Sequence, residues 1–347
     1  MEPSSTPAAA WRRMRILPAL LLSLSLLAAC GGNGDGGGPG TGSVEVSRDP
    51  VLLPADARNI VDEVNAGSDQ ANATLDESTQ ASVETSPALD VDDAVFKRAR
   101  ALGSSSIGSP GEIEEAVTFV PRQTDYPAQF VAFVKTDAPD NPSIPATNWL
   151  WTYEKAAADE PWKLAMYVVL PADFAAPEIE VDQDGFAQTV SEQEAGEYKL
   201  APHRVSEELA EYLSSYQTEV DSSIFVPGPY TSQLSQGLRA QAEREAAAEI
   251  TATVEVEAGE FPLQAFKRTD GSALVVFSQN MAMNYAAAPG KSLKPLRGSE
   301  GLLEQGDYAT IQRNVINMMA AEVPPATSEE MVRILGSTGG TVSFETT

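Results

Sequence analysis

The clearest fold signal in the sequence is the stretch ITATVEVE at residues 250–257. Its apolar residues Ile250, Ala252, Val254 and Val256 alternate with threonine and glutamate. Because successive side chains of a strand point to opposite faces of a sheet, this alternation predicts a half-buried β-strand. One face of its sheet should then cover a core while the other meets water, as is common in antiparallel sheets.

Strand patterns continue on the C-terminal side of this stretch. The sequence predicts further strands at residues 263–268, 273–285, 308–319, 331–335 and 341–344. Asp270-Gly271 is typical of a hairpin turn, and Gly339-Gly340 is expected to turn the chain into its last strand. On the N-terminal side, apolar residues recur at helical spacing over 205–220, and another helix is expected at 235–248.

The first half of the chain repeats this order of helices followed by strands. Helices are predicted at 60–75 and 88–102, before strands at 116–120, 130–134, 149–153 and 162–170. This order implies an α+β fold with an antiparallel sheet, because parallel strands need helical crossovers between them. We therefore predict two tandem cone-like modules, each with helices packed on a curved antiparallel sheet, after a lipoprotein signal peptide.

The domain boundaries follow from these patterns. Residues 1–29 are predicted to be the signal peptide, and residues 30–53 a lipidated cysteine with a flexible Gly-rich tether. The first cone module spans 54–172 and the second spans 205–347. An acidic linker rich in Pro, Asp, Glu and Gln joins them at 173–204.

The N-terminus has the parts of a bacterial lipoprotein signal. Arg12, Arg13 and Arg15 precede an apolar stretch of 12 residues at 16–27. A helix of that length measures about 18 Å, too short for a bilayer core of about 30 Å. The stretch ends in Leu27-Ala28-Ala29-Cys30, which resembles a lipobox, so Cys30 is the predicted site of lipid attachment.

A lipid on Cys30 predicts where the protein is located. Two acyl chains are enough for stable anchoring, and no later stretch approaches about 18 uninterrupted apolar residues. Residues 31–43 contain 8 glycines among 13 residues, which is typical of a flexible tether. We therefore expect the lipid to hold the protein at the extracytoplasmic face of the cell membrane.

Composition excludes several classes of protein. The 347 residues include 23 Lys and Arg against 50 Asp and Glu, a net charge of -27, so no nucleic-acid partner is expected. One Cys and one His cannot build a disulfide framework or a Cys/His metal cluster. No cofactor and no metal are expected, and His203 is interpreted as a solvated linker residue.

Several short motifs carry a family resemblance. They are the lipobox with its Gly-rich tether, Asp125-Tyr126-Pro127, Trp162 to Pro171, Asp184-Gly185, the segment from Asp270 to Val276, and Val323-Pro324-Pro325. With these motifs the chain resembles an actinobacterial lipoprotein family carrying a domain of unknown function. The resemblance implies two modules similar to the nuclear-transport-factor-like cone, and it implies no activity.

Aromatic residues of the first module are the leading candidates for a ligand site. Trp149, Trp151 and Tyr153 share one face if their segment is a strand, and Trp162 and Tyr167 can join them. One interpretation is an aromatic pocket for an apolar, lipid-like or sugar ligand. The other is that the rings fill the core of the cone.

The second module offers Gln279, a polar residue in an otherwise apolar row. Its neighbours on the same strand face are Phe277, Met281, Met283 and Tyr285. Gln279 is a candidate to orient a ligand. The Met281–Met283 pair could supply soft copper(I) ligands, but adaptable core filling is the simpler interpretation.

Two acidic clusters have plain structural interpretations. Glu180, Asp182 and Asp184 precede a glycine as in a calcium loop, but the bidentate glutamate expected at the loop's last position is missing. A solvated acidic linker explains them better. Asp90 and its neighbours 92 and 93 lie near a helix start, where negative charge suits the helix dipole.

These observations favour a non-enzymatic protein that binds or scaffolds something at the cell envelope. Its partners would be the membrane, through the lipid anchor, and either an envelope protein or an apolar small ligand. One alternative is an enzyme with carboxylate acid and base groups in a cone pocket; a deep cavity with a buried Asp or Glu facing Trp149 or Gln279 would favour it. Another alternative is a solute-binding lipoprotein of a transporter.

Overall fold

The computed structural model describes residues 49–109, 111–137, 147–218 and 222–347. Cys30, the signal peptide and nearly all of the tether lie outside these ranges. The structure is α+β with two antiparallel sheets, as the sequence predicts. The chain from Arg48 to Thr347 forms one compact unit.

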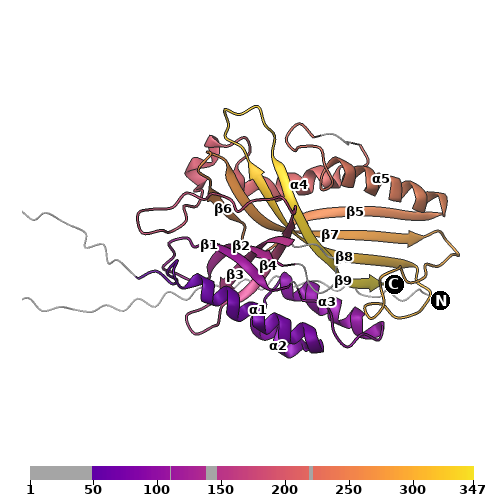
Figure 1. The fold of residues 1–347 in the computed structure, drawn as a ribbon. Helices are drawn as coiled ribbons and strands as arrows, with labels where there is room; N and C mark the ends of the chain where they lie inside the picture. The colour runs from indigo at the N-terminus through magenta and orange to yellow at the C-terminus, as the bar shows by residue number, and fades with distance from the viewer. Residues whose placement is uncertain (1–48, 110, 138–146, 219–221) are drawn as a thin grey trace, which may run out of the picture. The chain divides into compact units, whose positions relative to one another are not determined.

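The first half builds three helices and a four-stranded sheet. The helices are α1 (Ala57–Thr74), α2 (Glu77–Val83) and α3 (Ala88–Ala101). The strands follow one another as a meander in the order β1-β2-β3-β4. They are β1 (Ile113–Phe119), β2 (Ala128–Thr136), β3 (Thr147–Lys155) and β4 (Lys163–Leu170). Figure 1 shows the three helices alongside this sheet.

Helix α2 is the one element of this half that the sequence patterns miss. It has seven residues, too few for an apolar repeat to be recognised. Its start is fixed by Asp76, whose side chain accepts hydrogen bonds from the backbone N–H groups of Ser78 and Thr79. An N-cap of this kind contributes typically about 1 kcal/mol.

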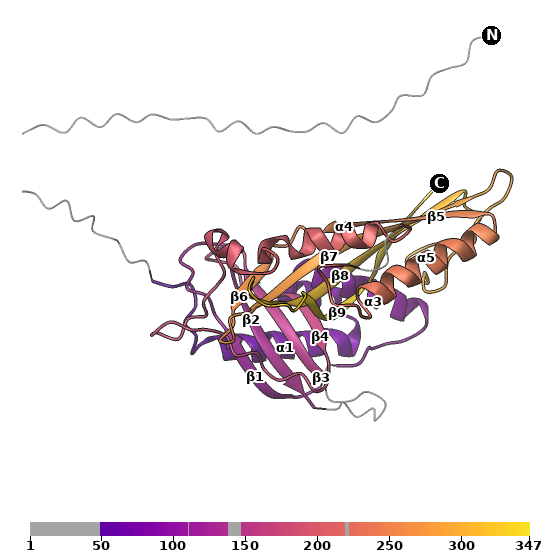
Figure 2. The same ribbon diagram turned by 90° about the horizontal axis from the view of Figure 1, so that it is seen from above.

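The second half contains the longer sheet. Its helices are α4 (Val205–Ser214) and α5 (Ser232–Ala247). Its strands are β5 (Ile250–Ala258), β6 (Gln264–Lys267), β7 (Ala273–Ala287), β8 (Thr310–Val323) and β9 (Arg333–Thr346). The order is β5-β7-β8-β9, and β6 pairs with the start of β7 across the predicted turn at Gly271. Figure 2 shows α4 and α5 running along the side of these strands.

The two sheets share a core, and each has helices on its other face. In the first sheet, Phe130 and Tyr153 pack against α1, while Val131 faces the opposite way. Val131 belongs to a cluster that also contains Val276 and Met318 of the second sheet. A third cluster joins the far side of the second sheet to α4 and α5. The layers are therefore helix, sheet, sheet and helix.

The prediction of a turn at Gly339-Gly340 is wrong. The two short strands expected at 331–335 and 341–344 are parts of one strand, β9, which runs through both glycines. Gly339 pairs with Asn317 of β8, and a Cβ at Gly339 would lie 2.0 Å from the carbonyl oxygen of Ile316. Glycine is therefore needed here because two backbones approach closely, and not because the chain turns.

Residues 173–204, which we predict to be an acidic linker, pack closely on the rest of the chain. Ile179, Phe186 and Ala187 are buried. Isolated bridges join this segment to residues 121, 266 and 268. Arg122 of the first half pairs with Asp182 at 2.9 Å and with Asp184 at 2.6 Å. These two carboxylates of the calcium-like motif thus hold the segment to the first half.

Candidate functional site

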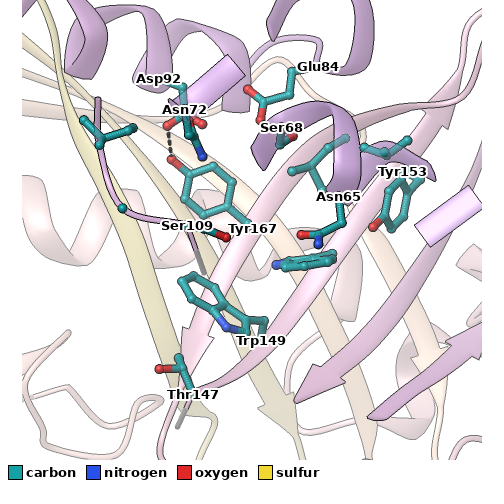
Figure 3. Close-up of a pocket in the computed structure, with 15 residues that line it drawn as sticks. Asn65, Ser68, Asn72, Glu84, Asp92, Ser109, Thr147, Trp149, Tyr153 and Tyr167 are labelled. Carbon is teal, nitrogen blue, oxygen red and sulfur yellow. Dashed lines mark hydrogen bonds between the residues drawn. The ribbon is translucent and has the colours of Figure 1, made fainter. Parts of the chain in front are cut away.

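A cavity of about 260 Å³ lies between the helices and the sheet of the first half. Its lining comes from α1, α3, the residue that follows α2, the loop at 107–109, and strands β3 and β4. Figure 3 shows aromatic rings from the strands on one side of it and polar side chains from the helices on the other. The cavity therefore has an apolar wall and a polar end.

The aromatic wall is built by strand periodicity. Trp149, Trp151 and Tyr153 alternate along β3, so they share the face that is turned toward α1, and all three line the cavity. Tyr167 of β4 completes the wall, with its ring centroid 6.4 Å from that of Trp149. The indole N–H of Trp149 donates to the Thr136 hydroxyl at 3.2 Å, which fixes the ring.

These aromatic residues lie partly in the core and partly at the cavity, and ligand binding by them stays a prediction. Tyr153 is fully buried and stacks on Phe130, with 4.7 Å between ring centroids. Trp151 is 4% exposed, and it belongs to the same core cluster as Phe130. Trp162 packs edge-on against Phe130 and is absent from the lining of the cavity. The wall is thus the part of the core that faces an unfilled space.

The polar end is formed by two carboxyl groups, Glu84 and Asp92. Asp92 accepts a hydrogen bond from the Tyr167 hydroxyl at 2.6 Å and one from the Gln80 amide at 3.3 Å. Glu84 is 1% exposed and accepts from the Ser68 hydroxyl at 3.3 Å. The two carboxyl groups also interact with each other, because the negative charge of Asp92 acts on Glu84.

Burial shifts the ionisation of this pair. It raises the pKa of Glu84 well above the ordinary value, and the negative charge of Asp92 raises it further. The pKa of Asp92 is also raised by burial, while the hydrogen bond from Tyr167 opposes that rise. Two carboxylates in contact cannot both ionise easily. The pair therefore holds one proton around neutral pH, and Glu84 is the residue that holds it.

Three buried polar atoms at this cavity have no hydrogen-bond partner. They are Oδ1 of Asn72, Oε2 of Glu84 and the hydroxyl oxygen of Tyr153. An unsatisfied buried polar group costs roughly 1–3 kcal/mol. All three residues line the cavity, so a molecule inside it can supply the missing partners.

Neither carboxyl group is a candidate site residue from sequence patterns alone. Glu84 directly follows α2, and the bridge between it and Leu164 of β4 brings it to the cavity. The sequence places Asp92 among three acidic residues near a helix start, where their charge suits the helix dipole. Asp92 lies four residues after Ala88 and four before Phe96, both fully buried, so it belongs to the inner face of α3. That spacing was the available signal for Asp92.

Gln279 does not reach this cavity. It lies on β7 in the second half, is 1% exposed, and donates to the backbone carbonyl of Ser206 in α4 at 2.8 Å. Met281 and Met283 pack in the same core cluster of the second half. Ligand binding by Gln279 stays an untested prediction, and the structure separates it from the other three candidates.

The remaining candidates lie outside the cavity. His203 is exposed in a short 3₁₀ helix, Pro202–Arg204, that precedes α4. Cys30 lies outside the described residues. Within the described ranges, none of the helices combines the length and the apolar character that a membrane span requires.

Comparison with known proteins places the chain in a family. Residues 48–345 match the family model described as "Domain of unknown function (DUF8094)". The chain is 24% identical over 312 residues to an uncharacterized lipoprotein of Streptomyces coelicolor, covering 87% of this chain and 89% of that protein. It is also 24% identical over 259 residues to an uncharacterized lipoprotein of Streptomyces avermitilis, covering 73% and 74%. The resemblance seen in the sequence is thereby confirmed, and the chain belongs to the actinobacterial lipoprotein family that carries this domain of unknown function.

Proposed function

We propose that this lipoprotein binds a small, mostly apolar molecule in the cavity of its first half. The observation that carries the proposal is the combination of an aromatic wall with three buried polar atoms that lack partners. Ligand sites usually combine a largely apolar lining with a few placed polar groups. A cavity with both features is suited to a molecule that has a ring or short chain and one polar end.

The size of the cavity supports a ligand over a packing defect. A dry apolar cavity of about 150 Å³ is already large enough to bind benzene, and this cavity has about 260 Å³. Its volume equals about eight or nine water molecules at about 30 Å³ each. Water alone could satisfy the polar end, but it would leave the rings of Trp149 and Tyr167 facing water inside the fold.

The lipid anchor supplies the location of this binding activity. We infer that Cys30 carries the lipid and that the folded body lies at the extracytoplasmic face of the cell membrane. The lipobox, the Gly-rich residues 31–43 and the lipoprotein relatives support this inference. Binding at this location, without a chemical reaction, remains the function that we favour.

Saturation-transfer NMR with benzyl alcohol tests binding directly. The full-length lipidated protein in detergent micelles is expected to transfer saturation to the probe, and Trp149→Ala should abolish the transfer because it removes part of the wall. Trp162→Ala is the matched control, since Trp162 packs on Phe130 outside the cavity. Equal transfer in all three proteins would place the probe elsewhere and refute the proposal.

One observation favours catalysis as a second candidate function. Glu84 is buried and Asp92 partly buried, and both line the same cavity as Trp149, which is the arrangement expected if the protein is an enzyme. Such a pair can supply a proton donor and a proton acceptor. A natural ligand recovered from the purified protein distinguishes the two functions. It should be unchanged after incubation if the protein only binds, and converted by wild type but not by Glu84→Gln if it is an enzyme.

A further inference from the structure

We propose that the ligand of this cavity carries a positive charge on an organic ammonium group. The proposal deepens the proposed function, since it names the chemical class of the ligand for the same site. It rests on the identity of every charged and aromatic group at the cavity.

The cavity has acidic groups and no basic ones. Its lining residues include Glu84 and Asp92, while none of the described lining residues is lysine, arginine or histidine. A buried charge is normally paired with an opposite charge, because desolvation is costly otherwise. The carboxyl pair instead keeps a proton, and the partner that would compensate its second negative charge is missing from the described part of the chain.

The groups around the pair come from α1, α2, α3, β3 and β4, and among the described residues none of these groups is an unpaired cation close to the carboxyl groups. Ser68 and Asn72 face it from α1, and the Gln80 amide faces it from α2. The titratable or charged neighbours are Asp93 of α3, Tyr153 of β3, and Tyr167 and Lys163 of β4. Lys163 lies at the surface, where its Nζ donates to the backbone carbonyl of Ala81 at 2.7 Å. Asp93 adds negative charge, which increases the attraction for a cation.

The unpartnered atoms point to the same class of ligand. The free oxygens of Asn72, Tyr153 and Glu84 can each accept a hydrogen bond or contact an ammonium group, and Asn72 Oδ1 can do nothing else. These side chains are 8%, 0% and 1% exposed. A ligand that brought further acceptors, such as a carboxylate or a phosphate, would meet two carboxyl groups and be repelled.

The aromatic wall completes a site for an organic cation. Trp149, Trp151, Tyr153 and Tyr167 line the cavity together with the carboxyl pair. Indole and phenol rings attract ammonium groups through their electron-rich faces, with about 2 kcal/mol or more available when the contact is desolvated. Rings also accept the apolar part of the same ligand. The net charge of -27 on the whole chain would concentrate cations near the protein.

The proposal makes binding of a cation depend on pH. A bound ammonium group favours the doubly ionised pair, so binding should release the proton that Glu84 and Asp92 share. Affinity should therefore rise with pH, by at most about tenfold per pH unit if one full proton is released. A neutral ligand has no such linkage, and its affinity should stay flat or fall as the pair ionises.

Calorimetric titration of the full-length protein with two probes tests the proposal. Benzyltrimethylammonium carries a permanent charge, so its own ionisation cannot contribute, and benzyl alcohol is the neutral probe of similar size. We expect the cation to bind at least about tenfold more tightly at pH 8, the ratio that a cation–π or ion-pair contact of ~1.4 kcal/mol produces. Titrations in two buffers with different heats of ionisation should detect proton release for the cation only.

Charge-removing variants locate the effect. Glu84→Gln and Asp92→Asn keep the shape of each side chain and should reduce the preference for the cation at least about tenfold. Asp90→Asn is the matched control, because Asp90 lies on the same helix as Asp92, is exposed and is absent from the cavity lining. If either cavity variant fails to fold, the pH dependence of the wild-type protein still decides the question.

The outcomes separate this inference from the proposed function. Benzyl alcohol binding as tightly as the cation, or a cation affinity that does not rise with pH, would overturn the inference and leave the ligand site intact. Failure of both probes to bind would overturn the proposed function itself. A preference for the cation that survives in both cavity variants would place the charged group elsewhere and would also overturn the inference.

Discussion

The two halves of the molecule bury their helix–sheet layers in different ways. In the second half, the face of β7 under α4 and α5 is filled by Phe277, Met281 and Met283. In the first half, the corresponding layer under α1 and α3 leaves a cavity of about 260 Å³. Both halves are helices on antiparallel strands, so the difference lies in the side chains. We expect the filled layer to contribute more to stability, while the open layer is where we propose that the ligand binds.

The largest expected effect is on the filled layer. Phe277→Ala removes a ring that is 1% exposed, and a buried Phe→Ala change costs about 3–5 kcal/mol in the free energy of unfolding. Chemical denaturation followed by circular dichroism measures the loss. A cost below about 1 kcal/mol would mean that this layer is not the well-packed half, and the comparison would fail.

Truncation of the cavity wall should destabilise the protein less than truncation of the filled layer, and it should remove binding. Trp149→Ala removes a larger side chain, but Trp149 is only partly buried and already faces open space. We expect a cost of about 1–2 kcal/mol in the free energy of unfolding, together with loss of binding of benzyl alcohol. A destabilisation as large as that of Phe277→Ala would show that Trp149 is a core residue.

The carboxyl pair should make the first half sensitive to pH. Folding raises the pKa of Glu84, so its contribution to stability is complete below the unfolded pKa of about 4.3 and is lost as pH rises through the raised folded pKa. Gln at position 84 cannot ionise, so above the raised folded pKa of Asp92 the stability of Glu84→Gln should stay level while that of wild type continues to fall. At pH 8 the variant should exceed wild type by on the order of 1–3 kcal/mol.

Thermal unfolding between pH 5 and pH 9 measures this difference. Asp90→Asn serves as the control again and should follow the wild-type curve. Parallel curves for wild type and Glu84→Gln would mean that Glu84 ionises as easily in the folded chain as in the unfolded chain. The predicted pH sensitivity of the first half would then be wrong.

The smallest expected effect concerns Gln279. Gln279→Met keeps the length of the side chain and removes one hydrogen bond, from the amide to the carbonyl oxygen of Ser206. Net loss of such a bond costs roughly 0.5–1.5 kcal/mol, and Oε1 of Gln279 has no partner to lose. Binding of benzyl alcohol should be unchanged. A changed affinity for benzyl alcohol would mean that Gln279 of the second half takes part in binding, and that the ligand site is not confined to the first half.

Strand and helix patterns of the sequence predict most of the fold. Alternation at 250–257 matches β5, and apolar spacing at 88–102 matches α3. The failures have physical causes. Helix α2 is short and depends on the Asp76 cap, which periodicity does not reveal. The Gly339-Gly340 pair looks like a turn, but the tight contact with β8 that requires glycine exists only in the folded sheet.

The candidate site could be predicted only in part. Trp149, Trp151 and Tyr153 come from one strand, so period-two alternation is enough to place them together. Glu84 follows α2, and Asp92 lies on α3. Only the packing of these two helices on β4 brings both carboxyl groups close to the aromatic side chains of β3. The shared core between the two sheets is likewise a tertiary feature, since residues such as Val131 and Met318 are far apart in the sequence.

Native mass spectrometry of the lipidated protein, purified from its own membranes, can show whether the cavity of the first half holds a ligand. We expect wild type to carry one small molecule per chain in addition to the lipid, and Trp149→Ala to carry none. Wild type without a bound small molecule, or the same adduct on both proteins, would contradict the claim that the cavity of the first half is a ligand site.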